Sequence, residues 1–138
     1  MRYPVMIDMD EERRNTTAYV PDIGMHCHLG GNNFDEQLDE LTYRVEQWLG
    51  EAILNNWPIR KPSHLNDLRG QQKNQPGIDR VWALIHISDE FYLDEVERIN
   101  ISISKKILAV LDSHAKHSHR TRSAMIAHMA LIYNDDRH

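Results

Sequence analysis

The feature that most constrains this chain is a strict alternation of apolar and polar residues in its last third, followed at once by two helical patterns. Residues 98–104 read Arg-Ile-Asn-Ile-Ser-Ile-Ser, so the isoleucines point one way and the polar side chains the other. Helical patterns follow over residues 105–112 and 121–133. A strand this short cannot bury its isoleucines against two short helices alone. It therefore needs a partner, and the simplest partner is a second copy of the same segment.

Two such strands would pair antiparallel and present a polar ribbon made of the same three side chains from each chain: Arg98, Asn100 and Ser102. A two-stranded ribbon fits the major groove of DNA, where Arg and Asn side chains read base edges. The alternative is an ordinary edge or core strand. The pattern thus favours a dimeric DNA-binding module.

This stretch resembles the ribbon-helix-helix DNA-binding family. In that family the second helix opens with a Ser/Thr-Arg-Ser sequence, and Thr121, Arg122 and Ser123 stand at those positions here. Residues 117–120, His-Ser-His-Arg, depart from the glycine that many members carry in the turn. The resemblance implies a base-reading ribbon and a second set of DNA-contacting residues that anchor it, with Thr121 capping a helix whose N-terminus faces a phosphate. This second set is Lys105, Lys106, Thr121, Arg122 and Ser123.

The net charge of −5 hides two oppositely charged parts. Residues 1–97 hold 18 Asp and Glu against 9 Lys and Arg, a net of −9, whereas residues 98–138 hold 3 against 7, a net of +4. A basic tail is expected if it meets phosphate, and an acidic body if it meets a basic partner. The alternative for the acidic part is a solvated surface.

The first 90 residues predict an α+β domain. Alternating patterns predict strands over 2–9, 16–20, 25–29 and 81–87, the first with Tyr3, Val5, Ile7 and Met9 on one face. A single long helix is expected from Phe34, capped by Asn33 and Glu36, to about Asn55, where Trp57-Pro58 stops it. Residues 60–79 show little periodicity and are expected to form a loop.

This domain also resembles a family. The ordered set of Tyr-Pro-Val-x-Ile-x-x-Asp at 3–10, Tyr-Val-Pro-Asp-Ile at 19–23, Gly-Asn-Asn-Phe-Asp-Glu-x-Leu at 31–38 and Pro-Ile-x-x-Pro-Ser at 58–63 is similar to HicB antitoxins. Residues 21–27 run one residue longer than the family's Pro-Asp-Leu-Pro-Gly-Cys. The resemblance implies a degenerate ribonuclease H-like sheet that has lost its catalytic carboxylates.

Catalytic and metal-binding alternatives find little support in the residue pattern. Asp8 lies on the strand face opposite Tyr3 and is expected to face solvent, and no Asp or Glu falls in residues 81–87, so a two-metal carboxylate site is not favoured. His26 and His28 share a strand face from which Cys27 points away, which argues against a zinc site. We therefore expect no enzyme activity, no metal and no cofactor.

Together these patterns predict two domains, residues 1–90 for toxin binding and 97–138 for dimerisation and DNA binding. By resemblance, the chain would neutralise a small HicA-like toxin ribonuclease and repress its own operon by binding operator DNA. The alternative is a stand-alone ribbon-helix-helix repressor whose N-terminal domain senses a ligand. We expect a homodimer, with a tetramer left open and the toxin-contact residues unassigned. No apolar run reaches 18 residues and no signal-peptide core opens the chain, so a cytoplasmic protein, nucleoid-associated when DNA-bound, is expected.

Overall fold

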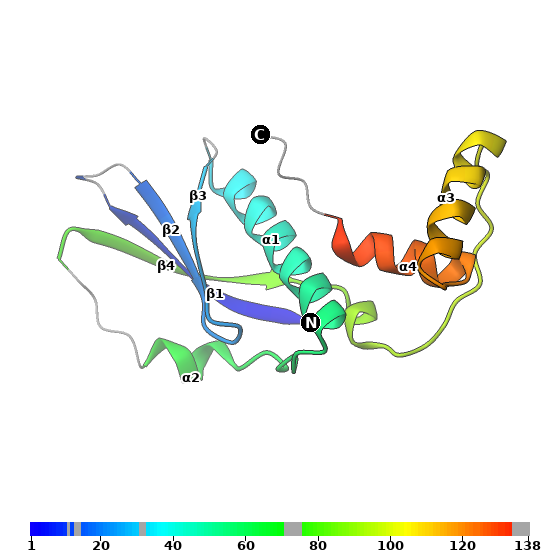
Figure 1. The fold of residues 1–138 in the computed structure, drawn as a ribbon. Helices are drawn as coiled ribbons and strands as arrows, with labels where there is room; N and C mark the ends of the chain where they lie inside the picture. The colour runs from blue at the N-terminus through cyan, green and yellow to red at the C-terminus, as the bar shows by residue number, and fades with distance from the viewer. Residues whose placement is uncertain (11, 13–14, 31–32, 71–75, 134–138) are drawn as a thin grey trace. The chain divides into compact units, whose positions relative to one another are not determined.

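The computed structural model describes residues 1–10, 12, 15–30, 33–70 and 76–133 of the chain (Figure 1). The chain divides into two compact units. The first holds Met1–Leu49 and Pro58–Leu93, and the second holds Gly50–Trp57 and the residues from Asp94 onward. The domain limits predicted from the sequence, 1–90 and 97–138, stay predictions. None of the helices in the described segments is long and apolar enough to span a bilayer.

The first unit is built on a four-stranded antiparallel sheet with strand order β3-β2-β1-β4. Its strands are β1 (Arg2–Asp10), β2 (Asn15–Val20), β3 (Met25–Leu29) and β4 (Ile78–His86). The turn between β2 and β3 places Gly24 at φ +66°, a left-handed conformation that glycine adopts without a steric penalty. The predicted α+β class and the predicted strands are confirmed, although β4 begins three residues earlier than expected.

One face of this sheet is covered by a single long helix, α1 (Phe34–Asn55). The Asn33 side chain accepts a hydrogen bond from the Glu36 amide (2.8 Å), which is the expected N-cap. At its other end Asn56 adopts φ +56°, and the Trp57 amide donates to the Ala52 carbonyl (2.8 Å). This left-handed residue, together with the following proline, ends the helix.

The core lies between α1 and the sheet. Apolar residues of α1 that recur every four positions pack against alternate residues of the central strand β1 and its neighbours. Tyr3, Val5 and Ile7 are fully buried as predicted, but Met9 is 42% exposed because the core ends at Ile7. The helix side contributes Leu41, Val45 and Leu49.

Pro4 lies within the central strand, where a missing backbone N–H would normally be costly. Met1 and Ile87 exchange both backbone hydrogen bonds (each 2.7 Å), so odd-numbered residues of β1 direct their N–H and C=O groups to β4. Pro4 therefore faces the β2 side. Because β2 pairs with β1 only from Met6 onward, no ladder bond is lost at Pro4.

The expectation of a plain loop over residues 60–79 is wrong. A short helix, α2 (Leu65–Arg69), forms inside it, followed by a described turn at residues 76–77. With only five residues, α2 is too short for a periodicity argument, and only its two leucines, three positions apart, fit a helical face. The 3₁₀ turn η1 (Asp89–Tyr92) follows β4 and ends this unit.

The tail of the second unit contains α3 (Lys105–His117) and α4 (Arg122–Ile132). The side chains of Ser104 and Thr121 accept hydrogen bonds from the Ile107 amide (3.3 Å) and the Ala124 amide (3.1 Å), so both expected N-caps form. Residues 93–104 have no regular secondary structure in the single chain. The strand predicted over 98–104 needs a partner strand for its ladder and stays a prediction.

The turn between α3 and α4 forms without glycine. His119 adopts φ +56°, its amide donates to the Lys116 carbonyl (3.2 Å), and the Arg120 amide donates to the Ala115 carbonyl (2.8 Å). These two bonds are those of a Schellman motif, which favours glycine at the position that His119 occupies. The departure from glycine noted in the sequence therefore leaves the turn geometry intact, but a side chain occupies a left-handed backbone.

Replacing His119 with glycine should stabilise the tail. A non-glycine residue in the left-handed region costs about 1–2 kcal/mol, which is partly offset by the greater flexibility of glycine in the unfolded chain. We expect His119→Gly to raise the free energy of unfolding by about 0.5–1 kcal/mol in urea titrations. The control His117→Gly, inside α3, should lower it by a similar amount. Destabilisation by His119→Gly would contradict the argument.

Candidate functional site

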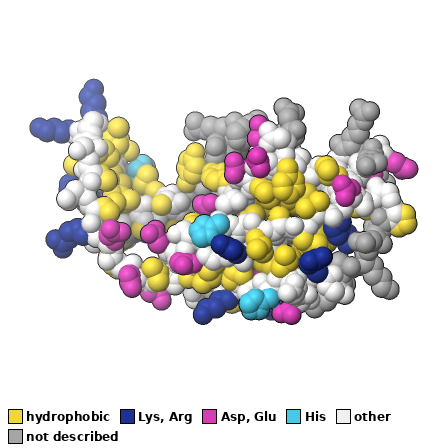
Figure 2. Space-filling view, turned by 180° about the vertical axis from the view of Figure 1, so that it is seen from behind, with side chains coloured by type: hydrophobic (Ala, Val, Ile, Leu, Met, Phe, Trp, Pro, Cys, Tyr) yellow, Lys and Arg dark blue, Asp and Glu magenta, His cyan; other side chains and the backbone are white. Residues whose placement is uncertain are grey.

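The tail exposes most of the apolar residues that its pattern assigned to a core. Within the tail only a small cluster is buried, formed by Leu111, Ala115 and Met125 with Leu108 packed against it. The isoleucines of the predicted ribbon are exposed to solvent, from 71% for Ile99 to 40% for Ile103. In Figure 2 hydrophobic side chains gather on this α3–α4 segment, at the left of the view, beside Lys and Arg side chains.

These exposed residues line a groove of about 240 Å³. Its lining is apolar except for one histidine: Ile101, Ile103, Ile107, Val110, Leu111, His114, Ile126 and Met129. Every ribbon isoleucine and helix residue named as part of a two-chain core either lines this groove, is exposed beside it or belongs to the small buried cluster. The groove is the surface that a second copy would have to fill.

The polar residues predicted to meet DNA are all exposed. Arg98, Asn100 and Ser102 lie in the segment before α3, which has no regular structure. Lys105 and Lys106 occupy the first turn of α3, and Ser123 the first turn of α4. The structure brings the basic residues to helix N-termini, whereas the order of the ribbon side chains depends on the strand pairing.

Arg122 makes a contact that the sequence did not suggest. Its guanidinium binds Asp112 of α3 through two bonds, Nε to Oδ1 (2.8 Å) and Nη2 to Oδ2 (2.9 Å). This hydrogen bonding lowers the pKa of the Asp112 carboxyl. Two of the five donors of Arg122 are used, so the remaining donors can still meet an anion.

The sheet face opposite α1 carries polar and aromatic side chains. The rings of Tyr19 and His26 stack at 4.1 Å with an angle of 16°. On the same face Arg80 binds Asp8 through two bonds of 2.7 and 2.9 Å. Asp8 is on the predicted face, but its side chain is only 18% exposed, so the expectation that it faces solvent is wrong. The cause is this pairing with the neighbouring strand, which a single strand pattern does not reveal.

Two adjoining cavities lie beside the turn between β2 and β3. One, of about 290 Å³, has Tyr19, Trp82 and Leu68 in its wall, and the other, of about 350 Å³, has Trp48 and Pro58. They share three lining residues, Pro21, Asp22 and Arg60. We call this pair of cavities the Arg60 cleft; its remaining lining residues are Ile23, Gly24 and Ser63.

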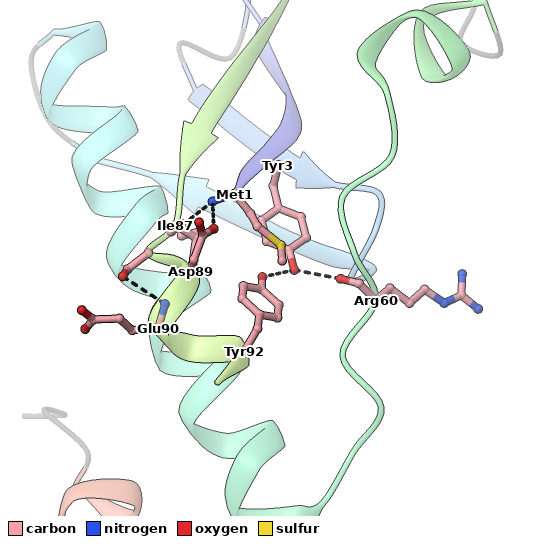
Figure 3. Close-up of polar contacts among 8 residues, drawn as sticks. Met1, Tyr3, Arg60, Ile87, Asp89, Glu90 and Tyr92 are labelled. Carbon is pink, nitrogen blue, oxygen red and sulfur yellow. Dashed lines mark hydrogen bonds and ion pairs between the residues drawn. The ribbon is translucent and has the colours of Figure 1, made fainter. Parts of the chain in front are cut away.

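A buried tyrosine fixes one wall of the Arg60 cleft (Figure 3). The hydroxyl of Tyr3 donates to the Arg60 carbonyl (2.9 Å) and shares a hydrogen bond with the hydroxyl of Tyr92 in η1. Burial raises the pKa of Tyr3, with the Tyr92 bond adding to the effect, so the hydroxyl stays protonated. Beside it the Met1 amine binds the Ile87 carbonyl (2.7 Å) and Asp89 (2.6 Å).

The described residues hold no group of three or more His, Cys, Asp or Glu positioned to bind a metal ion. His26 and His28 project from the helix-free face, while Cys27 packs toward the core with Ala18, its partner in β2. Burial raises the pKa of the Cys27 thiol, which keeps it in its neutral, less reactive form.

Sequence reasoning missed the Arg60 cleft. Its residues come from four separate segments, and neither the Tyr3–Arg60 bond nor the pairing of Asp22 with Ser63 follows any local pattern. The only signal in the sequence was the concentration of prolines at 21, 58 and 62, which marks fixed turns but not their meeting in space.

The fold and these surfaces agree with comparisons to known proteins. Residues 3–130 match the family model described as the HicB-like antitoxin of bacterial toxin-antitoxin systems, so the chain belongs to that family. A search of curated protein sequences found no match. The chain is similar to the antitoxin HicB of Burkholderia pseudomallei, with 25% identity, a TM-score of 0.55 and coverage of 96% of this chain and 97% of that one. It also matches the antitoxin HicB3, with 21% identity, a TM-score of 0.47 and coverage of 95% and 96%.

Proposed function

We propose that this HicB-type antitoxin acts through two surfaces. The N-terminal unit binds and neutralises a small toxin ribonuclease, and the tail dimerises and binds operator DNA, which represses the operon. The observation that carries the proposal is the match to the antitoxin family over residues 3–130, which spans both units. Two features of the chain support the division of labour: the change of net charge near residue 97 and the solvent-exposed apolar groove of the tail.

Dimerisation is supported by the energetics of the tail. A solvent-exposed side chain such as Ile, when fully buried, contributes about 1.5–3 kcal/mol, and the groove exposes several at once. Contiguous apolar surface of this kind on a small soluble unit marks an association site. A second copy would bring the same residues to the groove, and the two ribbons would supply each other's backbone hydrogen bonds.

Operator binding is supported by the charges and caps around the groove. Pairing the ribbons through their isoleucine faces would turn Arg98, Asn100 and Ser102 outward from the core. The N-termini of α3 and α4, capped by Ser104 and Thr121, carry the positive ends of the helix dipoles next to basic side chains. Such helix ends are suited to hold phosphates on either side of the ribbon.

Toxin neutralisation is tested by co-expression of the chain with the small reading frame beside its gene. We expect the two proteins to co-purify, and the toxin's growth arrest to be relieved only when the antitoxin is present. A chain that binds no such protein but loses DNA binding when a small molecule is added would instead support the stand-alone, ligand-sensing repressor.

Dimerisation is tested by Ile101→Asp. Ile101 is 58% exposed in the single chain, so the substitution spares the fold of the unit while placing a charge in the groove. Removing a buried isoleucine costs about 2–5 kcal/mol, and two-fold symmetry counts the loss twice per dimer. We expect a monomer that no longer binds operator DNA, measured by analytical ultracentrifugation. Val96→Asp, at an exposed position outside the groove, serves as the control and should leave the dimer intact.

Base reading by the ribbon predicts that two kinds of variant differ. Asn100→Ala should weaken operator binding by about 1–3 kcal/mol per half-site and leave binding to scrambled DNA nearly unchanged. Lys105→Gln should weaken both, and flatten the salt dependence by about one unit of slope, if it neutralises a phosphate. Titrations on both DNAs at several salt concentrations decide between them. Equal losses on both DNAs for Asn100→Ala would rule out the ribbon as the reading element.

A further inference from the structure

We infer that the Arg60 cleft is the surface on which the N-terminal unit receives its protein partner, and that the partner's bound segment is an extended strand. Alternate side chains of that segment fill the two cavities, and Arg60 binds the main chain between them. This inference rests on the proposed function, because the partner is the toxin that the antitoxin neutralises.

The shape of the cleft fits two side chains better than one compact ligand. Each cavity is at or near the lower end of the range typical of small-molecule sites, about 300–1,000 Å³. The two adjoin, since Pro21, Asp22 and Arg60 line both. In an extended segment, side chains two residues apart point the same way and are separated by about 7 Å, so one segment can occupy neighbouring cavities.

The walls of the cleft are aromatic and already held in place. Trp82 with Tyr19 lines one cavity and Trp48 the other. Aromatic walls accept bulky side chains, and Trp and Tyr are the residues that carry most binding energy in protein interfaces. The stacking of Tyr19 on His26 fixes its ring before any partner arrives.

Hydrogen bonds between distant segments fix the floor. Asp22 accepts from the Ser63 amide (2.9 Å) and from the Ser63 hydroxyl (2.5 Å), which ties the β2–β3 turn to the segment after α1. Tyr3 holds the Arg60 carbonyl from below. A surface fixed in this way loses little conformational entropy when it binds, which favours affinity.

Arg60 supplies the polar contact of the cleft. Figure 3 shows its carbonyl turned toward Tyr3 while its side chain extends away from the tyrosine pair. The side chain is exposed and lines both cavities, and its guanidinium carries five donors and no acceptor. The main-chain carbonyls of an extended segment are acceptors spaced to meet such a fork, so Arg60 recognises the backbone while the cavities select the side chains.

The test compares toxin affinity between matched pairs of variants of the full chain. Arg60→Glu removes the donors and faces the carbonyls with a carboxylate, while its control, Lys61→Glu, makes the same charge change one residue away and outside both cavities. Trp82→Ala opens one cavity, while Leu84→Ala shortens an exposed side chain on the same face of β4. Each cleft variant should weaken toxin binding by about tenfold or more, and each control by less than about threefold.

Thermal unfolding of all four variants separates folding from binding, because the Tyr3 bond is made to the Arg60 main chain and survives both substitutions at that position and beside it. Hydrogen exchange on the wild-type chain should show slower exchange for residues 19–24 and 58–63 when toxin is added. Wild-type affinity in both folded cleft variants would overturn this inference and leave the proposed function standing. A wild-type chain that binds no toxin would overturn the proposed function, and this inference with it.

Discussion

The packing of α1 against the central strand β1 is the contact on which the first unit depends. β1 is the strand that pairs with both of its neighbours, β2 and β4, and its residues Tyr3, Val5 and Ile7 are fully buried under the helix. Burying one such side chain contributes about 1.5–3 kcal/mol, which exceeds what a single hydrogen bond adds. Because one helix covers one face, the other face is left to polar, aromatic and loop residues. The Arg60 cleft exists because that second face has no helix.

Tyr3 links the core to the cleft. Its ring belongs to the packed face of β1, while its hydroxyl reaches the Arg60 carbonyl and the Tyr92 hydroxyl. A phenylalanine would satisfy the core equally well but would leave the Arg60 carbonyl without its bond. Tyrosine at this position therefore orders three segments at once: β1, the segment after α1 and η1. The same residue that stabilises the fold also sets the position of Arg60.

The tail presents the opposite situation, a surplus of apolar surface with too little chain to cover it. Its buried cluster holds only Leu111, Ala115 and Met125, while the isoleucines before α3 stay exposed. A unit of this size cannot close a core by adding loops, so its stability has to come from association. Concentration of the chain then becomes a term in the stability of the tail, whereas the first unit has its own core.

The contrast explains how much the sequence could predict. Periodic features were found because they repeat: four strands, α1 with its Asn33 cap, and the caps of α3 and α4 at Ser104 and Thr121. Features that depend on a single meeting of distant residues were missed, such as the Asp8–Arg80 pair, the Asp112–Arg122 pair and helix α2. Periodicity reports which face of an element is apolar, but not which polar residues meet on the other face.

The same reasoning assigns different kinds of recognition to the two surfaces. The tail's groove is readable from sequence because it is made of one alternating segment and two amphipathic helices, and a partner of identical sequence satisfies it by symmetry. The Arg60 cleft is assembled from four segments joined by hydrogen bonds, so its partner needs complementary shape instead of an identical sequence. Loops held by a rigid sheet can change their side chains without disturbing the core, since their anchoring bonds run largely through main-chain atoms and through Tyr3. Antitoxins built on this plan can therefore vary in the partner they bind while they keep one fold and one mode of self-association.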